Sequence, residues 1–203
     1  AVEETVGGLG GLAIGFGTAG FHRVAGFYRR RAIALAEQAG TLHDQGFAHL
    51  LAAVFTFQAG HWSDMDQHCD TGAAIFDRLG DRFRAQSCRV IQAFADLLRG
   101  DYARASLRLN AYGEEAEQVE NVPVRAWVLC GLALLDMQAG REPARVLHRI
   151  ALARSEALHR AERLLCDGIE AAAQLHAGNA GQALRAATTA LENMLESAPT
   201  MGI

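Results

Sequence analysis

Six residues near the start of the chain, Gly15 to Gly20, read GFGTAG and match the GxGxxG fingerprint of a dinucleotide-binding turn. Such a site needs a buried strand before the first glycine and a helix that opens at the last one. The preceding residues, GGLGGLAI, do not have the pattern of a strand. The glycines therefore predict the end of a helix, and no cofactor is expected.

The densest cluster of metal-ligating residue types consists of His61, Asp64, Asp66, His68 and Cys69. Asp64 and His68 are four residues apart, so on a helix they would share a face and could reach one divalent cation, with His61 as a third ligand. The competing interpretation is that both aspartates stabilise the first turn of a helix that Ser63 caps. We expect the aspartates to stabilise the helix start, and we predict no metal site.

Charge does not indicate nucleic acid or a membrane as a partner. The basic residues are 19 arginines with no lysine, and 23 acidic residues leave a net charge of -4. Two local clusters are an arginine stripe at Arg141, Arg145 and Arg149 and an acidic group at Glu114, Glu115, Glu117 and Glu120. Phosphate contact by the arginines is one interpretation. A solvated outer face, partly neutralised by neighbouring glutamates, is the interpretation we favour.

Motifs for catalysis are missing from the sequence, which contains no nucleophile elbow, HExxH or P-loop. The chain is therefore expected not to be an enzyme.

The cysteines, at 69, 88, 130 and 166, are widely spaced and form no CxxC. This spacing indicates neither a zinc ribbon nor a redox pair, and it is typical of a protein in a reducing cytoplasm.

The uncharged run from Thr5 to Phe21 raises the question of a membrane span. Its 17 residues fall short of the span of about 20 that a bilayer requires. Gly7, Gly11 and Gly15 have the GxxxG spacing of membrane helix pairs. We expect instead that this helix lets a neighbouring helix approach closely.

The chain also begins without Met or a basic leader, so it is expected to be a domain excised from a longer protein.

The elements that must position these residues are predicted to be helices. Half of the residues are hydrophobic, 7% are aromatic, and only 3 are prolines. Alanine and leucine are frequent, whereas runs of Val, Ile and Thr are few. This composition predicts an all-α fold.

A repeat organises the chain. Glycines at 20, 60, 100, 140 and 178 are spaced by 40, 40, 40 and 38 residues, and an alanine stands seven residues before each. A second set of breaks lies midway, at Gly40, Gly80, residues 121–123 and about His159. Helix starts are indicated by Thr41, Ser63 and Asn179, and by Pro123 and Pro143 in first turns. The pattern predicts ten helices that form helical hairpins.

The residues GDYARA at 100–105, with Ala93 before them, resemble the turn of a tetratricopeptide (TPR) repeat. The period near 40 exceeds the 34 residues of the standard repeat, so the helices should be longer. The arrangement is similar to C-terminal helical regions of large bacterial signalling proteins, especially those joining an adenylate cyclase or regulator module to an AAA-type ATPase. The resemblance implies a single domain, 1–203, that forms a right-handed α-solenoid of about five TPR-like repeats, approximately 1–40, 41–80, 81–120, 121–158 and 159–198.

In TPR-like stacks the first helix of each hairpin lines a concave groove. The resemblance places there the residues Phe47, Leu50, Val54, Phe57, Val90, Phe94, Leu97, Trp127, Leu134 and Met137, followed by Leu165, Ala172 and Leu175. Within each helix their spacing of three and four puts them on one face. The competing interpretation is that they fill the core between neighbouring helices.

These observations predict a cytoplasmic, non-enzymatic interaction or regulatory domain that binds a peptide or helix in an apolar groove. The alternative is a sensor of a small apolar ligand that controls an attached catalytic or DNA-binding module. An open groove would favour the first function, and a closed apolar pocket the second. Self-association into a homodimer is a further prediction, with no nucleic acid or membrane as partner.

Overall fold

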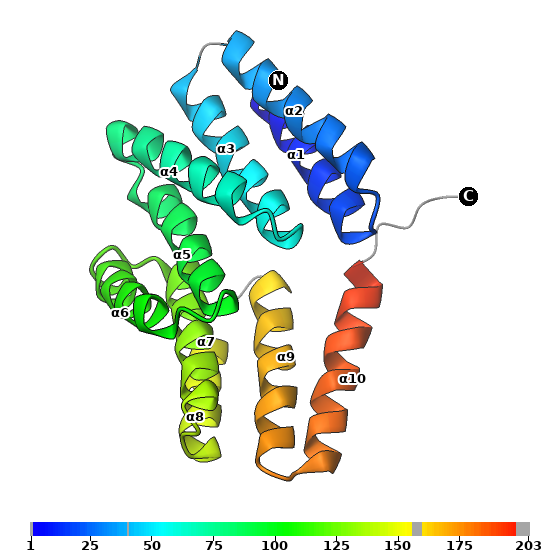
Figure 1. Ribbon diagram of the computed structural model, residues 1–203, viewed down its shortest axis with the longest axis vertical. Coiled ribbons are helices and arrows are strands. Elements are labelled where there is room, and N and C mark those ends of the chain that lie inside the picture. Colours follow the sequence, from blue (N-terminus) through cyan, green and yellow to red (C-terminus); the bar gives the residue numbers. More distant parts are fainter. Residues whose placement is uncertain (1, 40, 156–159, 198–203) are drawn as a thin grey trace. The chain divides into compact units, whose positions relative to one another are not determined.

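A computed structural model describes residues 2–39, 41–155 and 160–197, which form ten α-helices and no strand (Figure 1). The predicted all-α fold is confirmed. None of these helices combines the length and apolar character that a membrane span requires. The chain divides into two compact units, Ala1–Ala105 and Ser106–Ile203, which are described separately.

The first unit is built around its third helix. Its helices are α1 (Val2–Thr18), α2 (His22–Ala39), α3 (Leu42–Gln58), α4 (Trp62–Leu79) and α5 (Arg82–Leu98). Helix α3 packs against each of the other four, and α1 also packs on α2 and α4 on α5. The main hydrophobic cluster comprises Ala53, Met65, Cys69, Phe76, Ala85, Cys88 and Ala95. Small side chains dominate this cluster, so the helices lie close together.

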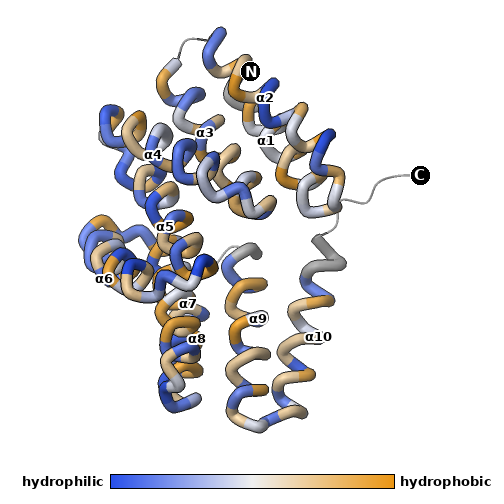
Figure 2. The backbone as a smooth tube through the Cα atoms, viewed as in Figure 1, coloured by the Kyte–Doolittle hydropathy of each residue, from blue (hydrophilic) through white to orange (hydrophobic). Residues whose placement is uncertain are grey.

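The second unit contains most of α6 and the four helices that follow. Their bounds are α6 (Tyr102–Gln118), α7 (Val122–Gln138), α8 (Pro143–Ser155), α9 (Arg160–His176) and α10 (Ala180–Ser197). Helix α7 packs on α8, α9 packs on α10, and α9 also contacts α7 and α8. In both units hydrophobic and hydrophilic positions alternate around the helices (Figure 2), and the apolar side supplies the buried contacts.

The predicted glycine breaks are helix ends. Gly20, Gly60, Gly100, Gly140 and Gly178 have φ between 64° and 84°, and Gly80 has 71°. In each of these turns the amide of the next residue donates to the carbonyl oxygen five positions before it, at 2.8–2.9 Å. This bond satisfies a carbonyl that the helix end leaves unpaired, and the left-handed backbone it needs favours glycine. The predicted breaks at Gly40 and about His159 lie outside the described residues.

Most of the predicted helix starts are confirmed. The Thr41 hydroxyl accepts a hydrogen bond from the Asp44 amide, and Pro123 and Pro143 occupy first turns. The prediction of Ser63 as a cap is wrong. Helix α4 begins one residue before Ser63, because the Gly60 turn fixes His61 as the residue that precedes the helix.

The GFGTAG segment is the end of α1, as the repeat predicts. The expected close approach of a neighbouring helix also occurs, and the closest contacts are made by Gly10 and Gly17; of the GxxxG set only Gly7 faces α3, where an added methyl group would lie 3.4 Å from the Phe47 ring. A methyl group at Gly10 would lie 2.9 Å from Cβ of Leu51, and one at Gly17 would lie 3.0 Å from the Phe55 ring, both on α3. Gly11 and Gly15 face open space. Gly10 and Gly17 therefore set the distance between α1 and α3.

Candidate binding groove

A groove of about 400 Å³ lies between α6, α7 and α8 in the second unit. Its apolar lining consists of Leu109, Val128, Leu129, Leu132 and Leu152, and its polar lining includes Asn110, Glu114, Glu117, Arg125, Arg149 and Ser155. Several polar lining residues on α6 and α8 are exposed, so the groove opens to solvent. The combination is an apolar floor with a charged rim.

The turn between α6 and α7 positions two walls of this groove. Asn121 is buried, and its side chain accepts a hydrogen bond from the Val124 amide at 3.3 Å, which fixes the start of α7. Further from this turn, Gly113 on α6 faces Val128 on α7. A methyl group added at Gly113 would lie 3.1 Å from the Val128 side chain. Glycine at this point brings the two helices together at the groove floor.

Arginine pairs hold the wall on α8. Both Arg145 and Arg149 donate through Nε to the same carboxylate oxygen of Asp136, at 2.8 and 2.7 Å. Burial alone would raise the pKa of Asp136, but the two hydrogen bonds and the arginine charges outweigh burial and leave that pKa lowered. Two guanidinium groups on one carboxylate leave a net positive charge on this wall.

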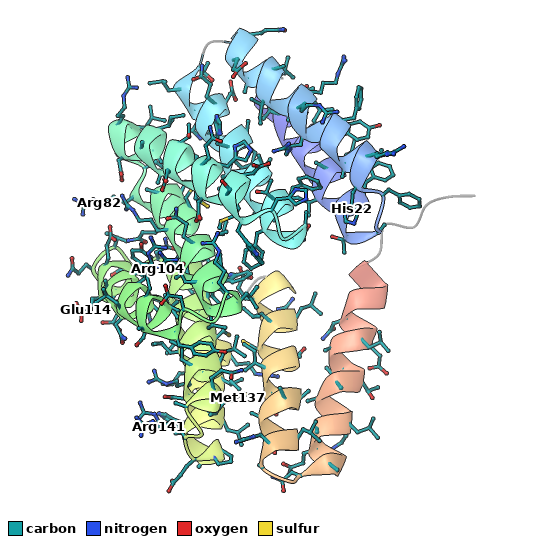
Figure 3. All side chains as sticks on the ribbon, in the orientation of Figure 1. His22, Arg82, Arg104, Glu114, Met137 and Arg141 are labelled. Carbon is teal, nitrogen blue, oxygen red and sulfur yellow. The ribbon has the colours of Figure 1, made fainter. Side chains whose placement is uncertain are left out.

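The opposite wall is acidic. Glu114 and Glu117 belong to α6, are exposed, and line the groove; Figure 3 shows Glu114 on the outside of α6. Of the predicted arginine stripe, Arg149 lines the groove, so the site carries charges of both signs. Within that stripe, Arg145 and Arg149 pair with Asp136, whereas Arg141 precedes the helix.

In the first unit the residues predicted to line a groove lie against or within the core. Phe47, Leu50 and Phe57 pack, half-buried, on the cluster around Phe76. Val54 is also half-buried. Three more from α5 are between 4% and 7% exposed: Val90, Phe94 and Leu97. Their role in binding stays a prediction.

In the second unit the predicted residues lie outside the α6–α8 groove. The Trp127 indole donates to Glu162 on α9 at 3.1 Å, while Leu134 and Met137 on α7 are half-buried; Met137 is labelled in Figure 3. From α9, Leu165 is half-buried, and Ala172 and Leu175 are exposed. Sequence reasoning missed the stripe Arg125, Val128, Leu129 and Leu132, which has helical spacing. Because α7 is apolar on most sides, the sequence did not show which of its faces would border a groove.

The polar cluster around residue 64 does not converge. Asp66 pairs with Arg99 at 2.7 Å, and the Cys69 thiol contacts the Met65 sulfur at 3.6 Å. His61 is exposed at the helix start. Within the described ranges, no three His, Cys, Asp or Glu side chains are arranged to hold a metal ion.

His68 instead belongs to a half-buried chain of polar groups across three helices. Arg29 on α2 donates to Nε2 of His68 at 2.9 Å, and Nδ1 of His68 lies 3.0 Å from Nδ1 of His49 on α3. Since Nε2 of His68 accepts, its Nδ1 carries the proton and donates to His49. The pKa of His68 is lowered to about 4, mainly by burial and additionally by the neighbouring His49 and Arg29. The chain is therefore neutral at its histidines and links α2, α3 and α4.

Comparison with known proteins adds no family to this geometry. No protein-family model matches the sequence, and no curated protein matches it.

Proposed function

We propose that this chain is a non-enzymatic interaction domain that binds an amphipathic helix or peptide in the groove between α6, α7 and α8. As the TPR-like resemblance implies, it would serve as a regulatory domain within a larger bacterial signalling protein. Occupancy of the groove would change the spacing of the three helices and so be transmitted along the chain.

The observation that carries this proposal is the open groove with an apolar floor and a charged rim. Leu109 and Val128 are already buried, so affinity would come from covering Leu129, Leu132 and Leu152, which are accessible. Charges at the rim would set orientation and association rate. Leu152, 43% exposed, is an apolar anchor available on the rim. A bound helix would cover it.

The charges define the partner's chemistry. The α6 wall carries Glu114 and Glu117, and the opposite side carries Arg125 and Arg149. A complementary helix would have a stripe of apolar residues, basic residues on the flank that meets α6, and acidic residues on the other flank.

A small-molecule sensor is the second candidate, favoured by the size of the groove. A volume of about 400 Å³ falls in the range of about 300–1,000 Å³ that small ligands occupy. In that case the ligand would be largely apolar. The charged and exposed rim favours the peptide over this alternative.

The test uses a synthetic amphipathic peptide with leucines at i, i+3, i+4 and i+7, lysines on one flank and glutamates on the other. Fluorescence anisotropy should show saturable binding to the 203-residue chain. Leu152→Glu should weaken it about tenfold or more, because it places a charge on the contact surface. Leu184→Glu is the matched control: Leu184 on α10 is 69% exposed and lies outside the groove, so binding should be unchanged.

Equal effects of the two leucine variants would overturn the groove as the binding site. Native mass spectrometry beside a denatured control separates the two candidates. A retained organic ligand of a few hundred daltons, lost in Leu152→Glu, would replace the peptide proposal with the sensor. The subunit number seen in the same spectrum tests the predicted homodimer.

A further inference from the structure

The fold brings together two cysteines that are far apart in sequence. Sγ of Cys130 on α7 lies 3.6 Å from Sγ of Cys166 on α9, although 36 positions separate them. The two side chains are 1% and 0% exposed. Helices α7 and α9 pack directly on each other. The sequence alone suggested no redox pair because it lacks CxxC, whereas the helix packing creates one.

A cation lies beside the pair. The two thiols share one hydrogen bond, in which either sulfur can be the donor. The positive charge of Arg154 favours the thiolate form of both cysteines, and Arg154 is held in place by Asp167 at 2.8 Å and Glu170 at 2.6 Å. Either sulfur can therefore be the nucleophile that attacks an oxidant.

We propose that Cys130 and Cys166 form a dithiol that hydrogen peroxide oxidises to an intramolecular disulfide joining α7 to α9. A disulfide needs its sulfurs about 2.05 Å apart. The existing 3.6 Å separation shortens to that value by side-chain rotation and a small helix shift. This modification site is independent of the α6–α8 groove.

The chemistry balances in two steps. The thiolate of one cysteine of the pair attacks a peroxide oxygen, the O–O bond breaks, and the leaving hydroxide takes up a proton to give water, so that this cysteine becomes a sulfenic acid. The sulfur of the other cysteine then attacks the sulfenic acid sulfur, the S–O bond breaks, and hydroxide leaves with the proton of the second thiol as a second water. Overall, two thiols lose two electrons and the peroxide gains them.

Burial sets the rate of this oxidation. Both sulfurs are covered, so the peroxide reaches them during local opening of the α7–α9 contact, and oxidation should be slow compared with that of an exposed thiol. Once formed, the cross-link holds the two helices together and opposes that opening. The thermal midpoint of the second unit should rise by about 5–10 °C.

The experiment treats the full 203-residue chain with hydrogen peroxide, blocks remaining thiols, and digests the unreduced protein with trypsin. Because the chain has arginine and no lysine, the four cysteines fall in separate peptides: 126–141 and 164–185 for the pair, and 32–78 and 85–89 for Cys69 and Cys88. The expected product is peptide 126–141 joined to 164–185, with a loss of about 2 Da relative to the two thiols.

Cys88 is the matched control, because burial raises the pKa of its thiol to about 12. Cys88→Ser should leave the cross-link intact, whereas Cys130→Ser and Cys166→Ser, each checked for native helicity by circular dichroism, should abolish it. The proposal would be overturned if all four thiols were blocked after treatment, if a different linkage formed, or if Cys130 or Cys166 were oxidised beyond the sulfenic acid without a cross-link. If unfolding in urea is required before the cross-link forms, the native pair is not the site and the proposal fails.

Discussion

In the first unit, α1 approaches α3 closely because Gly10 and Gly17 present no side chain to Leu51 and Phe55. In the second unit, α6 meets α7 at Gly113, yet a groove of about 400 Å³ remains between α6, α7 and α8. The glycine turns that the structure describes share one geometry in both units, so these turns do not cause the difference. The size of the side chains at the helix contacts decides whether neighbouring helices close on each other or leave a binding surface.

The two units also differ in how they bury charge. Asp96 and Asp136 stand at the same place in the repeat, four residues before Gly100 and Gly140. The Asp96 carboxylate is fully buried and pairs with Arg104 and Arg99, at 2.6 and 3.6 Å. The Asp136 side chain is 12% exposed and holds two arginines beside the groove. One repeat position thus pairs with arginines in the interior of the first unit and, in the second unit, holds Arg149, which lines the groove.

The largest expected effect comes from filling the α1–α3 contact. Gly10→Leu should lower the free energy of unfolding by about 2 to 3 kcal/mol, because the new side chain overlaps Leu51 and forces the helices apart. Urea denaturation followed by circular dichroism measures this. Gly11→Leu is the control on the same helix: no atom lies within 4 Å of an added methyl group there, so better helix propensity should stabilise by about 0.5 to 1 kcal/mol. If Gly10→Leu and Gly11→Leu lowered the free energy of unfolding equally, close packing at Gly10 would be refuted.

Asp96→Asn should cost about 2 kcal/mol, because it removes a buried carboxylate from its arginine partners. Asp136→Asn should cost about 1 kcal/mol, since Arg145 is 57% exposed and solvent screens that pairing. Chemical denaturation of the two variants under identical conditions gives the ranking. A larger loss at Asp136 would show that the groove wall carries more of the stability than the interior of the first unit.

The histidine chain should make the first unit sensitive to acid. The pKa of His68 is about 4 when folded against 6.5 unfolded, so the unfolded chain binds more protons between these values. Stability is present above pH 6.5 and falls as the pH drops toward 4, by about 1 to 2 kcal/mol after allowance for partial exposure. The charged groups around the pair are Arg29, Arg30, Glu37 and Asp64.

Thermal midpoints of the native chain and of His68→Gln, measured from pH 7 to pH 4, test this dependence. The glutamine cannot titrate, so the variant should lose less stability across the same window. Parallel pH profiles would mean that other groups, and not the Arg29–His68–His49 chain, govern the acid response.

The smallest expected effect concerns the α6–α7 turn. Glu120 has φ of 53°, where the other described turns of this kind have glycine. Glu120→Gly should stabilise the chain by about 0.5 to 1 kcal/mol, because a side chain is strained in the left-handed region. Gly100→Ala should destabilise by about 1 kcal/mol for the same reason. Differential scanning calorimetry would detect both shifts, and a loss on Glu120→Gly would contradict the strain.

Part of the site was accessible from the sequence. The arginines at 145 and 149 and the glutamates at 114 and 117 stood out as charge clusters, and Arg149, Glu114 and Glu117 line the groove. That these charges border one groove together with Val128 and Leu132 was not predictable, because it depends on which face of α7 is turned toward α6 and α8. Likewise, no local sequence motif indicates that Cys130 and Cys166 meet. They are 36 positions apart, and their contact arises from the packing of α7 on α9.

The sequence by itself determined the elements. Composition favours helices, and glycines at regular spacing end them, because a left-handed residue and a single hydrogen bond form within each turn whatever the surroundings. Only the tertiary structure decided which apolar faces close into a core, where a groove stays open, and which distant side chains meet. These outcomes depend on the volumes of side chains brought together from different helices, and no local stretch of sequence contains that information.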